Sequence, residues 1–394
     1  AYGVGAYIRE LTAVLKDSNI KVCIVNIASD KPQIQTEETD GIRQWYIPKV
    51  IAQQRTIEDQ KIDDLYYRNV VYLLQLHIED KKNLVFHLNY NQCGSLAEEL
   101  KNAFDCKLIA VSHFTEWGFK IYDNLPRLRT ILKEEDPDSL EESVKKSFEE
   151  DRSYYSKVDQ VICLSEYMQD ILCQDYGLDR ANISIIPNGL PDIAPPVMDV
   201  EFLRNKWYIS SGEKVILFAG RMDEVKGVSY LMKAFREVVQ QYPEVRLILA
   251  GSGSYDTFLQ EAKDICTKIT FTGLLEKDEL YELYQLADIG VVPSLFEPFG
   301  YVAVEMMIHE LPLVATATSG LNEVVDSTCG LKVPLTGLPE NVEIDPSLLA
   351  QKIMYLIQHP TEAKKLGQNG RKRYLKEYSS EIFRRNMLHL YTSL

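Results

Sequence analysis

The feature that most constrains this sequence is the alternation of short apolar runs with longer amphipathic segments. Each run is rich in β-branched residues and almost continuously apolar, which is typical of a parallel strand covered on both faces. Between the runs lie segments with helical periodicity, such as 228–242 and 347–358. This alternation predicts an α/β fold of doubly wound sheets. The runs occupy residues 20–28, 83–88, 107–112, 160–165 and 183–187 in the first half, and 214–220, 245–251, 268–273, 289–294 and 311–316 in the second.

The number of strands favours two sheets over one, and the proline-rich segment 188–199 is the best candidate for a linker between two domains. Residues 126–157 are charged and helical without a strand, so we expect a helical elaboration of the first domain with a solvated face. Residues 1–15 look like a glycine loop that enters a helix. Such a loop normally follows a first strand. We therefore expect either that this strand lies outside this sequence or that the first domain departs from the usual pattern.

Composition narrows the classes of function. The 43 basic and 58 acidic residues give a net charge of −15, which disfavours binding along a nucleic acid. The seven cysteines form no C-x-x-C motif, so neither a disulfide framework nor a zinc cluster is expected, and a reducing compartment is indicated. No apolar run approaches the ~20 residues that span a bilayer, and no signal peptide opens the chain. We expect a cytoplasmic protein without a transmembrane segment, whose contact with the inner membrane surface, if any, is peripheral.

The second half carries four loops of small and polar residues, each directly after an apolar run. In an open α/β sheet, ligands bind at the carboxyl ends of the strands. The first loop contains Gly220, Arg221 and, at the start of a helical segment, Lys226. Two cations at a helix start favour a phosphate, but two unrelated surface cations are an equally good interpretation of this loop alone. Gly251 and Gly253 in the second loop are weak evidence, because a tight turn accounts for them.

Two acids eight residues apart follow the run 289–294. Glu297 lies in the third loop, where a carboxylate can accept hydrogen bonds from sugar hydroxyls, although compensation of a helix dipole is the alternative. Glu305 lies in the apolar helical segment VAVEMM, where a carboxylate needs a hydroxyl or cation partner; this favours a functional Glu305 over an exposed one. The fourth loop, 317–323, is a further candidate anion cradle. Together the four loops outline a pocket for a nucleotide diphosphate.

Five strings resemble the retaining glycosyltransferases of family 4. The resemblance covers nearly the whole chain, and the E-x7-E pattern of Glu297 and Glu305 is fairly specific in this context. The strings are YGVGAYIREL (2–11), IPNGLP (186–191), FAGRMDEVKGVSYLMKAF (218–235), PSLFEPFGYVAVEMM (293–307) and LPLVATATSGLNEVV (311–325).

The resemblance implies the GT-B fold, in which two Rossmann-like doubly wound domains face each other across a cleft. Residues 1–190 would form the acceptor-side domain, with the helical insert at about 114–157. Residues 191–378 would bind the nucleotide sugar, and a C-terminal helix in 379–394 would pack back towards the first domain.

Site residues follow from the resemblance where the motifs match. Arg221 and Lys226 would bind the donor diphosphate and stabilise the leaving group. Glu297 would contact hydroxyls of the donor sugar, and Glu305 the ribose. His113 resembles the family's active-site histidine, whereas its local context alone favours a hydrogen-bonded histidine at a strand end. The other implied donor-binding residues are Gly3, Gly5, Gly220, Gly251, Gly273, Leu274, Pro298, Phe299, Gly300 and Tyr301.

Three further residues carry expectations. Ser319 stands where the family commonly has a glycine. Glu310 stands where a helix-ending glycine is common, so this turn is expected to place a non-glycine residue in a strained conformation. His87 also ends an apolar run, and for it we expect a structural role.

The implied reaction moves a sugar from a UDP- or GDP-linked donor to an acceptor hydroxyl, with retention of the anomeric configuration, in glycoconjugate synthesis. The implied acceptor is a sugar, a lipid-linked molecule or a peptide. We expect no cofactor and no metal, because the two cations and the helix N-termini can stabilise the leaving diphosphate. A non-catalytic partner subunit of the same fold is the alternative from another class, and a phosphorylase or an epimerase is a third.

Overall fold

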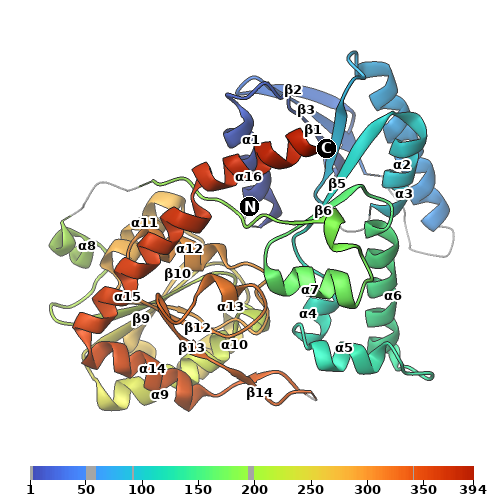
Figure 1. The fold of residues 1–394 in the computed structure, drawn as a ribbon. Helices are drawn as coiled ribbons and strands as arrows, with labels where there is room; N and C mark the ends of the chain where they lie inside the picture. Colours follow the sequence, from blue (N-terminus) through green and yellow to red (C-terminus); the bar gives the residue numbers. More distant parts are fainter. Residues whose placement is uncertain (1–2, 50–58, 91–92, 194–198, 340) are drawn as a thin grey trace.

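The computed structural model describes residues 3–49, 59–90, 93–193, 199–339 and 341–394. The chain forms two α/β domains, one from each half (Figure 1). Tyr2 of the opening motif and residues 194–198 of the expected linker lie outside the described residues.

All five apolar runs of the first half form strands, as predicted. The expected helical elaboration is also present, and its longer helix buries Phe148, Tyr154 and Tyr155 on one face while the charged face is solvated. The elements are α1 (Val4–Leu15), β1 (Cys23–Ser29), β2 (Gln35–Thr39), β3 (Ile42–Pro48), α2 (Asp59–His77), β4 (Leu84–Leu88), α3 (Gly94–Ala103), β5 (Cys106–Ser112), α4 (Glu116–Ile121), α5 (Leu125–Ile131), α6 (Ser139–Tyr155), β6 (Gln160–Cys163), α7 (Glu166–Gln174) and β7 (Ile183–Ile185).

The described strands of the first half form two separate sheets. Strands β4, β5, β6 and β7 are parallel neighbours in that order, with Leu88 opposite Ala110. In the other sheet β3 pairs with β1 in parallel and with β2 in an antiparallel hairpin. The prediction that every run is covered on both faces is wrong for β1, β4 and β7, whose residues are mostly only half-buried. All three are edge strands, and an edge strand has no neighbour on one side.

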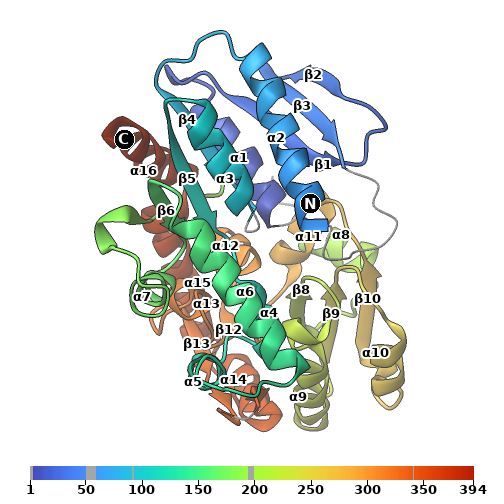
Figure 2. The same cartoon turned by 90° about the vertical axis from the view of Figure 1, so that its right-hand side faces the viewer.

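Helices cover both faces of the β4–β7 sheet (Figure 2). Side chains of α2, α3 and α6 pack with Leu108 and Ala110 of β5 on one face. Side chains of α1 and of the C-terminal helix α16 (Ser380–Ser393) pack with Ile109 and Val111 on the other. Because successive side chains of a strand point to opposite faces, these apolar residues of β5 contact a helical layer on each side of the sheet.

The second half is a single α/β domain in which all five apolar runs again form strands. The short strands β13 to β15 of this domain do not correspond to any of the predicted apolar runs. The elements are α8 (Val200–Lys206), β8 (Lys214–Ala219), α9 (Val228–Gln241), β9 (Val245–Ala250), α10 (Asp256–Glu261), β10 (Ile269–Gly273), α11 (Lys277–Leu286), β11 (Ile289–Val292), α12 (Tyr301–Ile308), β12 (Leu313–Thr316), α13 (Leu321–Val324), β13 (Gly330–Val333), β14 (Leu335–Thr336), β15 (Glu343–Ile344), α14 (Pro346–Gln358) and α15 (Pro360–Arg373).

The main sheet of this domain has the strand order β10-β9-β8-β11-β12-β13, and all of its pairs are parallel. Helices α9, α10, α14 and α15 contribute to the core on one face, and α11, α12 and α13 on the other. The order reverses between β8 and β11. In a doubly wound sheet this reversal opens a crevice at the carboxyl ends of the two strands, where ligands bind.

The chain crosses between the domains twice, at neighbouring positions. The backbone N–H of Leu190 donates to the carbonyl of Tyr378 at 2.9 Å, and the N–H of Ser380 donates to the carbonyl of Leu190 at 2.9 Å. Helix α16 then lies against α1 of the first domain (Figure 1), and the Arg384 guanidinium donates to the carbonyl of Val14.

Candidate active site

The loops after β8 and β11 lie at the strand-order reversal, where ligands bind in doubly wound sheets. In the first loop, the carboxylate of Asp223 accepts a hydrogen bond from the backbone N–H of Lys226 at 3.1 Å. Gly227 follows with a φ of 69°, and a β-carbon there would lie 1.8 Å from the carbonyl oxygen of Pro293. Only glycine satisfies both conditions, so the backbones of the two loops are held in direct contact.

This contact brings Lys226 and Glu297 together. The ammonium of Lys226 donates to the Glu297 carboxylate at 2.6 Å, and the hydroxyl of Ser294 lies 3.4 Å from the same oxygen. The two charged side chains are only 19% and 17% exposed. The crevice therefore holds a cation suited to a phosphate directly beside an anion suited to hydroxyl groups.

Arg221 lies in the same loop as Lys226 but has a different partner. Its guanidinium pairs with Asp223 at 3.2 Å, and its side chain is 61% exposed. The predicted pair of cations thus shares one loop, and Asp223 contacts both members through its side chain.

Gly251 is required by packing. A β-carbon at Gly251 would lie 1.7 Å from the carbonyl oxygen of Gly220, whereas one at Gly220 would meet only the ring of Phe218, at 3.4 Å. The loop after β9 is therefore packed against the loop after β8. Gly253 is constrained in the same way by Met222.

Glu305 is buried on α12, with 4% exposure, as the apolar neighbours predict. The hydroxyl of Tyr284 on α11 donates to its carboxylate at 2.9 Å. Burial raises the pKa of Glu305, and the hydrogen bond from Tyr284 opposes this shift. The sequence does not reveal Tyr284 as a partner, because the two residues lie on different helices and meet only through packing.

The segment Pro298–Tyr301 leads from the crevice into α12. Gly300 has a φ of 98°, and Phe299 is buried against the rings of Tyr301 and Tyr378. The hydroxyl of Tyr301 is buried without a hydrogen-bond partner. A buried phenol hydroxyl without a partner is costly, which is compatible with a group that a ligand satisfies.

The remaining glycines of the predicted site lie in open surroundings. Gly3, the residue before α1, has a φ of 82°, and Gly273, at the end of β10, has a φ of 76°; a β-carbon at either would meet nothing within 4 Å. Gly5 is exposed in the first turn of α1, and Leu274 is 67% exposed. Gly273 and Leu274 lie two strands away from β8, at the outer edge of the sheet.

His113 directly follows β5 in the first domain and is 8% exposed. Its Nε2 lies 3.1 Å from Oδ1 of Asn89, which follows the neighbouring strand β4. The ring of Tyr7 on α1 packs edge-on against the imidazole, with 4.7 Å between ring centroids. Burial lowers the pKa of His113 to about 3, so the imidazole is neutral near pH 7.

His87 lies in a second polar chain beside His113. Its Nε2 is 3.1 Å from the hydroxyl of Tyr7, and its Nδ1 is 2.7 Å from the hydroxyl of Tyr391 on α16. Burial also lowers the pKa of His87 to about 3. These contacts link three elements of the first domain, as expected of a structural histidine.

Helix α4, which begins shortly after His113, reaches across to the second domain. The ring of Phe119 packs edge-on against Phe296 at 4.9 Å, and a β-carbon at Gly118 would lie 2.7 Å from the Phe296 ring. Phe296 directly precedes Glu297. The segment that follows His113 therefore lies against the loop that carries Glu297.

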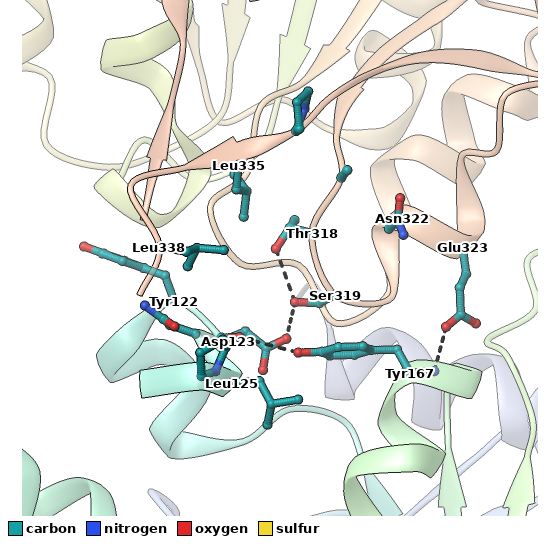
Figure 3. Close-up of a pocket in the computed structure, with 14 residues that line it drawn as sticks. Tyr122, Asp123, Leu125, Tyr167, Thr318, Ser319, Asn322, Glu323, Leu335 and Leu338 are labelled. Atoms are coloured by element: carbon teal, nitrogen blue, oxygen red, sulfur yellow. Dashed lines mark hydrogen bonds between the residues drawn. The ribbon is translucent and has the colours of Figure 1, made fainter. Parts of the chain in front are cut away.

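A cavity of about 390 Å³ lies between the domains, lined by the segment after α4 and the loop after β12 (Figure 3). Asp123 and Ser319 point towards each other in it, and the Ser319 hydroxyl donates to the Asp123 carboxylate at 2.5 Å. Burial raises the pKa of Asp123 to about 7, against the effect of its hydrogen bond from Ser319.

The loop 317–323, which is predicted to be a further anion cradle, lies at a contact between the two domains. The Glu323 carboxylate accepts hydrogen bonds from the backbone N–H groups of Glu166 and Tyr167, at 2.8 and 2.7 Å, at the start of α7 (Figure 3). The loop therefore joins the two domains, and the anion cradle stays a prediction.

Glu310 has the strained conformation expected of it, and Ser319 has a similar one. Glu310, after α12, has a φ of 55°, and Ser319 has a φ of 42°. Both values lie in the left-handed region that favours glycine. At Ser319, the side chain that replaces the missing glycine forms the hydrogen bond to Asp123.

Two negative findings concern the described part of the chain. Within it, no helix has both the length and the apolar character needed to cross a bilayer. Among the same residues, no cluster of His, Cys, Asp and Glu side chains could hold a metal ion. All seven cysteines are free.

Comparisons with known proteins agree with this architecture. Residues 1–192 match the model of glycosyltransferase family 4, and residues 199–373 match that of glycosyl transferases group 1. The mannosylfructose-phosphate synthase of Agrobacterium fabrum is 32% identical over 196 residues, which are 46% of this chain and 43% of that protein. The chain spans about half the length of the curated relatives that it matches.

Solved structures are similar over the whole chain. The sucrose-phosphate synthase of Thermosynechococcus elongatus has a TM-score of 0.76 at 23% identity, covering 100% of this chain and 94% of that one. The Anabaena protein HepE, solved with UDP and glucose, has a TM-score of 0.71 at 17% identity, covering 99% and 96%. At these identities the solved structures support the fold alone, and the assignment to a family comes from the two family models. The chain belongs to the family 4 glycosyltransferases and has their GT-B fold of two Rossmann-like domains.

Proposed function

We propose that this protein transfers a sugar from a nucleotide diphosphate sugar to an acceptor hydroxyl with retention of the anomeric configuration. The observation that carries the proposal is the Lys226–Glu297 pair at the strand-order reversal, 2.6 Å apart. A ligand that pairs with both residues must present an anionic group next to hydrogen-bond donors. A sugar bound to a diphosphate has this arrangement.

Each predicted site residue receives a role in this proposal. Lys226 and Arg221 bind the diphosphate and stabilise it as it leaves. Glu297 accepts hydrogen bonds from the sugar, and Glu305 from the ribose. The further donor-binding residues are Gly3, Gly5, Gly220, Gly251, Gly273, Leu274, Pro298, Phe299, Gly300 and Tyr301.

We assign the acceptor to the domain of residues 1–190 and the donor to that of 191–378, with 379–394 as the helix that returns to the first domain. The contacts of α16 with α1 support this division. The acceptor is a sugar, a lipid-linked molecule or a peptide, and nucleic acid is disfavoured by the charge of −15. The free thiols support a cytoplasmic site for the reaction, at or near the inner membrane surface.

In the proposed reaction, the bond between the anomeric carbon and the diphosphate oxygen breaks. A bond to the acceptor oxygen forms on the same face, and the acceptor proton passes to the leaving phosphate. The Lys226 ammonium offsets the charge that develops on that phosphate, in the role that a metal ion would otherwise have, so we propose metal-independent transfer. His113, with a pKa of about 3, is neutral and acts as a hydrogen-bonding group rather than as the base.

The donor is UDP- or GDP-linked in this proposal, and the HepE structure with UDP and glucose favours UDP. The test is the thermal unfolding midpoint in EDTA with a panel of nucleotides and nucleotide sugars. A ligand at about 100 times its Kd stabilises the folded state by about 2.7 kcal/mol.

Two lysine variants make the test specific. Lys226→Ala should lose the stabilisation. Lys214→Ala should keep it, because Lys214 pairs with Asp288 at the opposite end of β8. Stabilisation by no member of the panel would instead favour a non-catalytic partner subunit.

A further inference from the structure

Asn89 uses both ends of its side-chain amide. Its Nδ2 donates to the backbone carbonyl of His87 at 3.3 Å, and its Oδ1 faces Nε2 of His113 at 3.1 Å. A carbonyl oxygen can only accept, so the contact with His87 fixes which end of the amide is nitrogen. The atom that faces His113 is therefore the oxygen.

The identity of this atom determines the tautomer of His113. An amide oxygen can only accept a hydrogen bond, so Nε2 of His113 must carry a proton. A neutral imidazole carries one proton, which leaves Nδ1 as an acceptor. Burial keeps this imidazole neutral near pH 7.

The ring of His113 is also held from its side. Tyr7 packs edge-on against it, and the hydroxyl of Tyr7 is itself bound to His87. The His113 side chain is thus confined by Asn89 at one nitrogen and by an aromatic ring at its edge. Such confinement fixes the direction in which the other nitrogen points.

We propose that Asn89 is a positioning residue that holds His113 in the Nε2–H tautomer, so that its Nδ1 accepts a hydrogen bond from a hydroxyl group of the bound sugar. The proposal rests on the proposed function for the presence of a sugar in the cleft. The opposite tautomer would present an N–H to that hydroxyl and would select a different orientation of the sugar.

The first experiment is ¹⁵N NMR of the imidazole nitrogens in the full chain without substrate, with the His113 signals assigned by their loss in His113→Gln. The wild-type protein should show the Nε2–H tautomer. Asn89→Leu removes the acceptor and should populate the Nδ1–H form. Asn369→Leu is the control, because its amide also donates to a backbone carbonyl but lies in the second domain.

The second experiment measures nucleotide release from UDP-glucose and GDP-mannose. Asn89→Leu should lower kcat/KM about tenfold, because one hydrogen bond is worth about this factor, whereas Asn369→Leu should leave kcat/KM unchanged. Circular dichroism and unfolding midpoints verify that the variants fold.

The outcomes separate the two proposals. The Nδ1–H tautomer in the wild type, or an unchanged tautomer in Asn89→Leu, overturns the role of Asn89 whether or not a sugar is transferred. A changed tautomer with unchanged kcat/KM also overturns it, because the tautomer would then not matter to the sugar. Absence of nucleotide release in the wild type, with stabilisation by no nucleotide, counts against the proposed function instead.

Discussion

A buried carboxyl in the first domain allows the pH dependence of stability to be calculated from the structure. Asp151 on α6 is 2% exposed, and its Oδ2 accepts a hydrogen bond from the hydroxyl of Tyr176 at 3.3 Å. The same hydroxyl receives the indole N–H of Trp117 at 2.9 Å. Burial raises the pKa of Asp151 from 3.8 to about 7, although the bond from Tyr176 opposes the shift.

The sign of the effect follows from proton binding. Between pH 3.8 and about pH 7 the folded state keeps the proton on Asp151 and the unfolded state loses it. The stability that Asp151 contributes is therefore complete below its unfolded pKa and is lost as the pH rises through its folded pKa. Each pH unit in this window costs about 1.4 kcal/mol, so raising the pH from about 5 to about 8 costs about 2.5 kcal/mol.

Asp151→Asn should remove this cost, because the amide does not ionise. The assay is urea unfolding followed by tryptophan fluorescence, since Trp117 reports on this core. We compare the free energy of unfolding of the variant with that of the wild type at each pH. From about pH 5 to about pH 8, the variant's value should increase by about 2.5 kcal/mol relative to the wild type's. Asp170→Asn, at an exposed carboxylate paired with Arg180, should show no such change. An equal gap between wild type and Asp151→Asn at both pH values would refute the reasoning.

Three further substitutions test the site and its frame. Glu310→Gly should raise the free energy of unfolding by about 1 kcal/mol in urea, because it removes the cost of the left-handed conformation; no gain would contradict the strain. Gly227→Ala should lower it by at least about 2 kcal/mol, because its β-carbon would meet the Pro293 carbonyl, and wild-type stability would exclude that contact. Glu305→Gln keeps an acceptor for Tyr284, so its unfolding midpoint should not fall. Its nucleotide affinity, measured by calorimetry, should fall about tenfold. An unchanged affinity would show that Glu305 does not contact the nucleotide.

The strands predicted from the sequence are present because burial in a parallel sheet requires apolar β-branched residues along the whole strand. The same criterion fails for the hairpin of β2 and β3. Strand β2 has the sequence QTEET and is mostly exposed, so it carries no apolar signal. The turn signal was available at Asp40 and Gly41, which both have positive φ. Edge strands that face water are therefore found from their turns rather than from their strands.

The loops of the candidate site could be predicted, because the carboxyl ends of parallel strands necessarily meet at one edge of the sheet. The partners of the site residues could not. Glu297 lies 71 residues from Lys226, Tyr284 lies 21 from Glu305, and Asp123 lies 196 from Ser319. The two residues of each pair lie on different elements, so the separations are set by how the sheets, helices and domains pack.

These partners decide the chemistry of the side chains that the loops present. The sequence places His113 at a strand end, where its local context favours a hydrogen-bonded histidine and the family resemblance an active-site residue, but the sequence does not determine its protonation state. Burial and the amide oxygen of Asn89 together make it a neutral side chain with one acceptor nitrogen. A motif can therefore locate a functional residue, whereas its protonation state, and with it the step it can perform, depends on neighbours contributed by other strands.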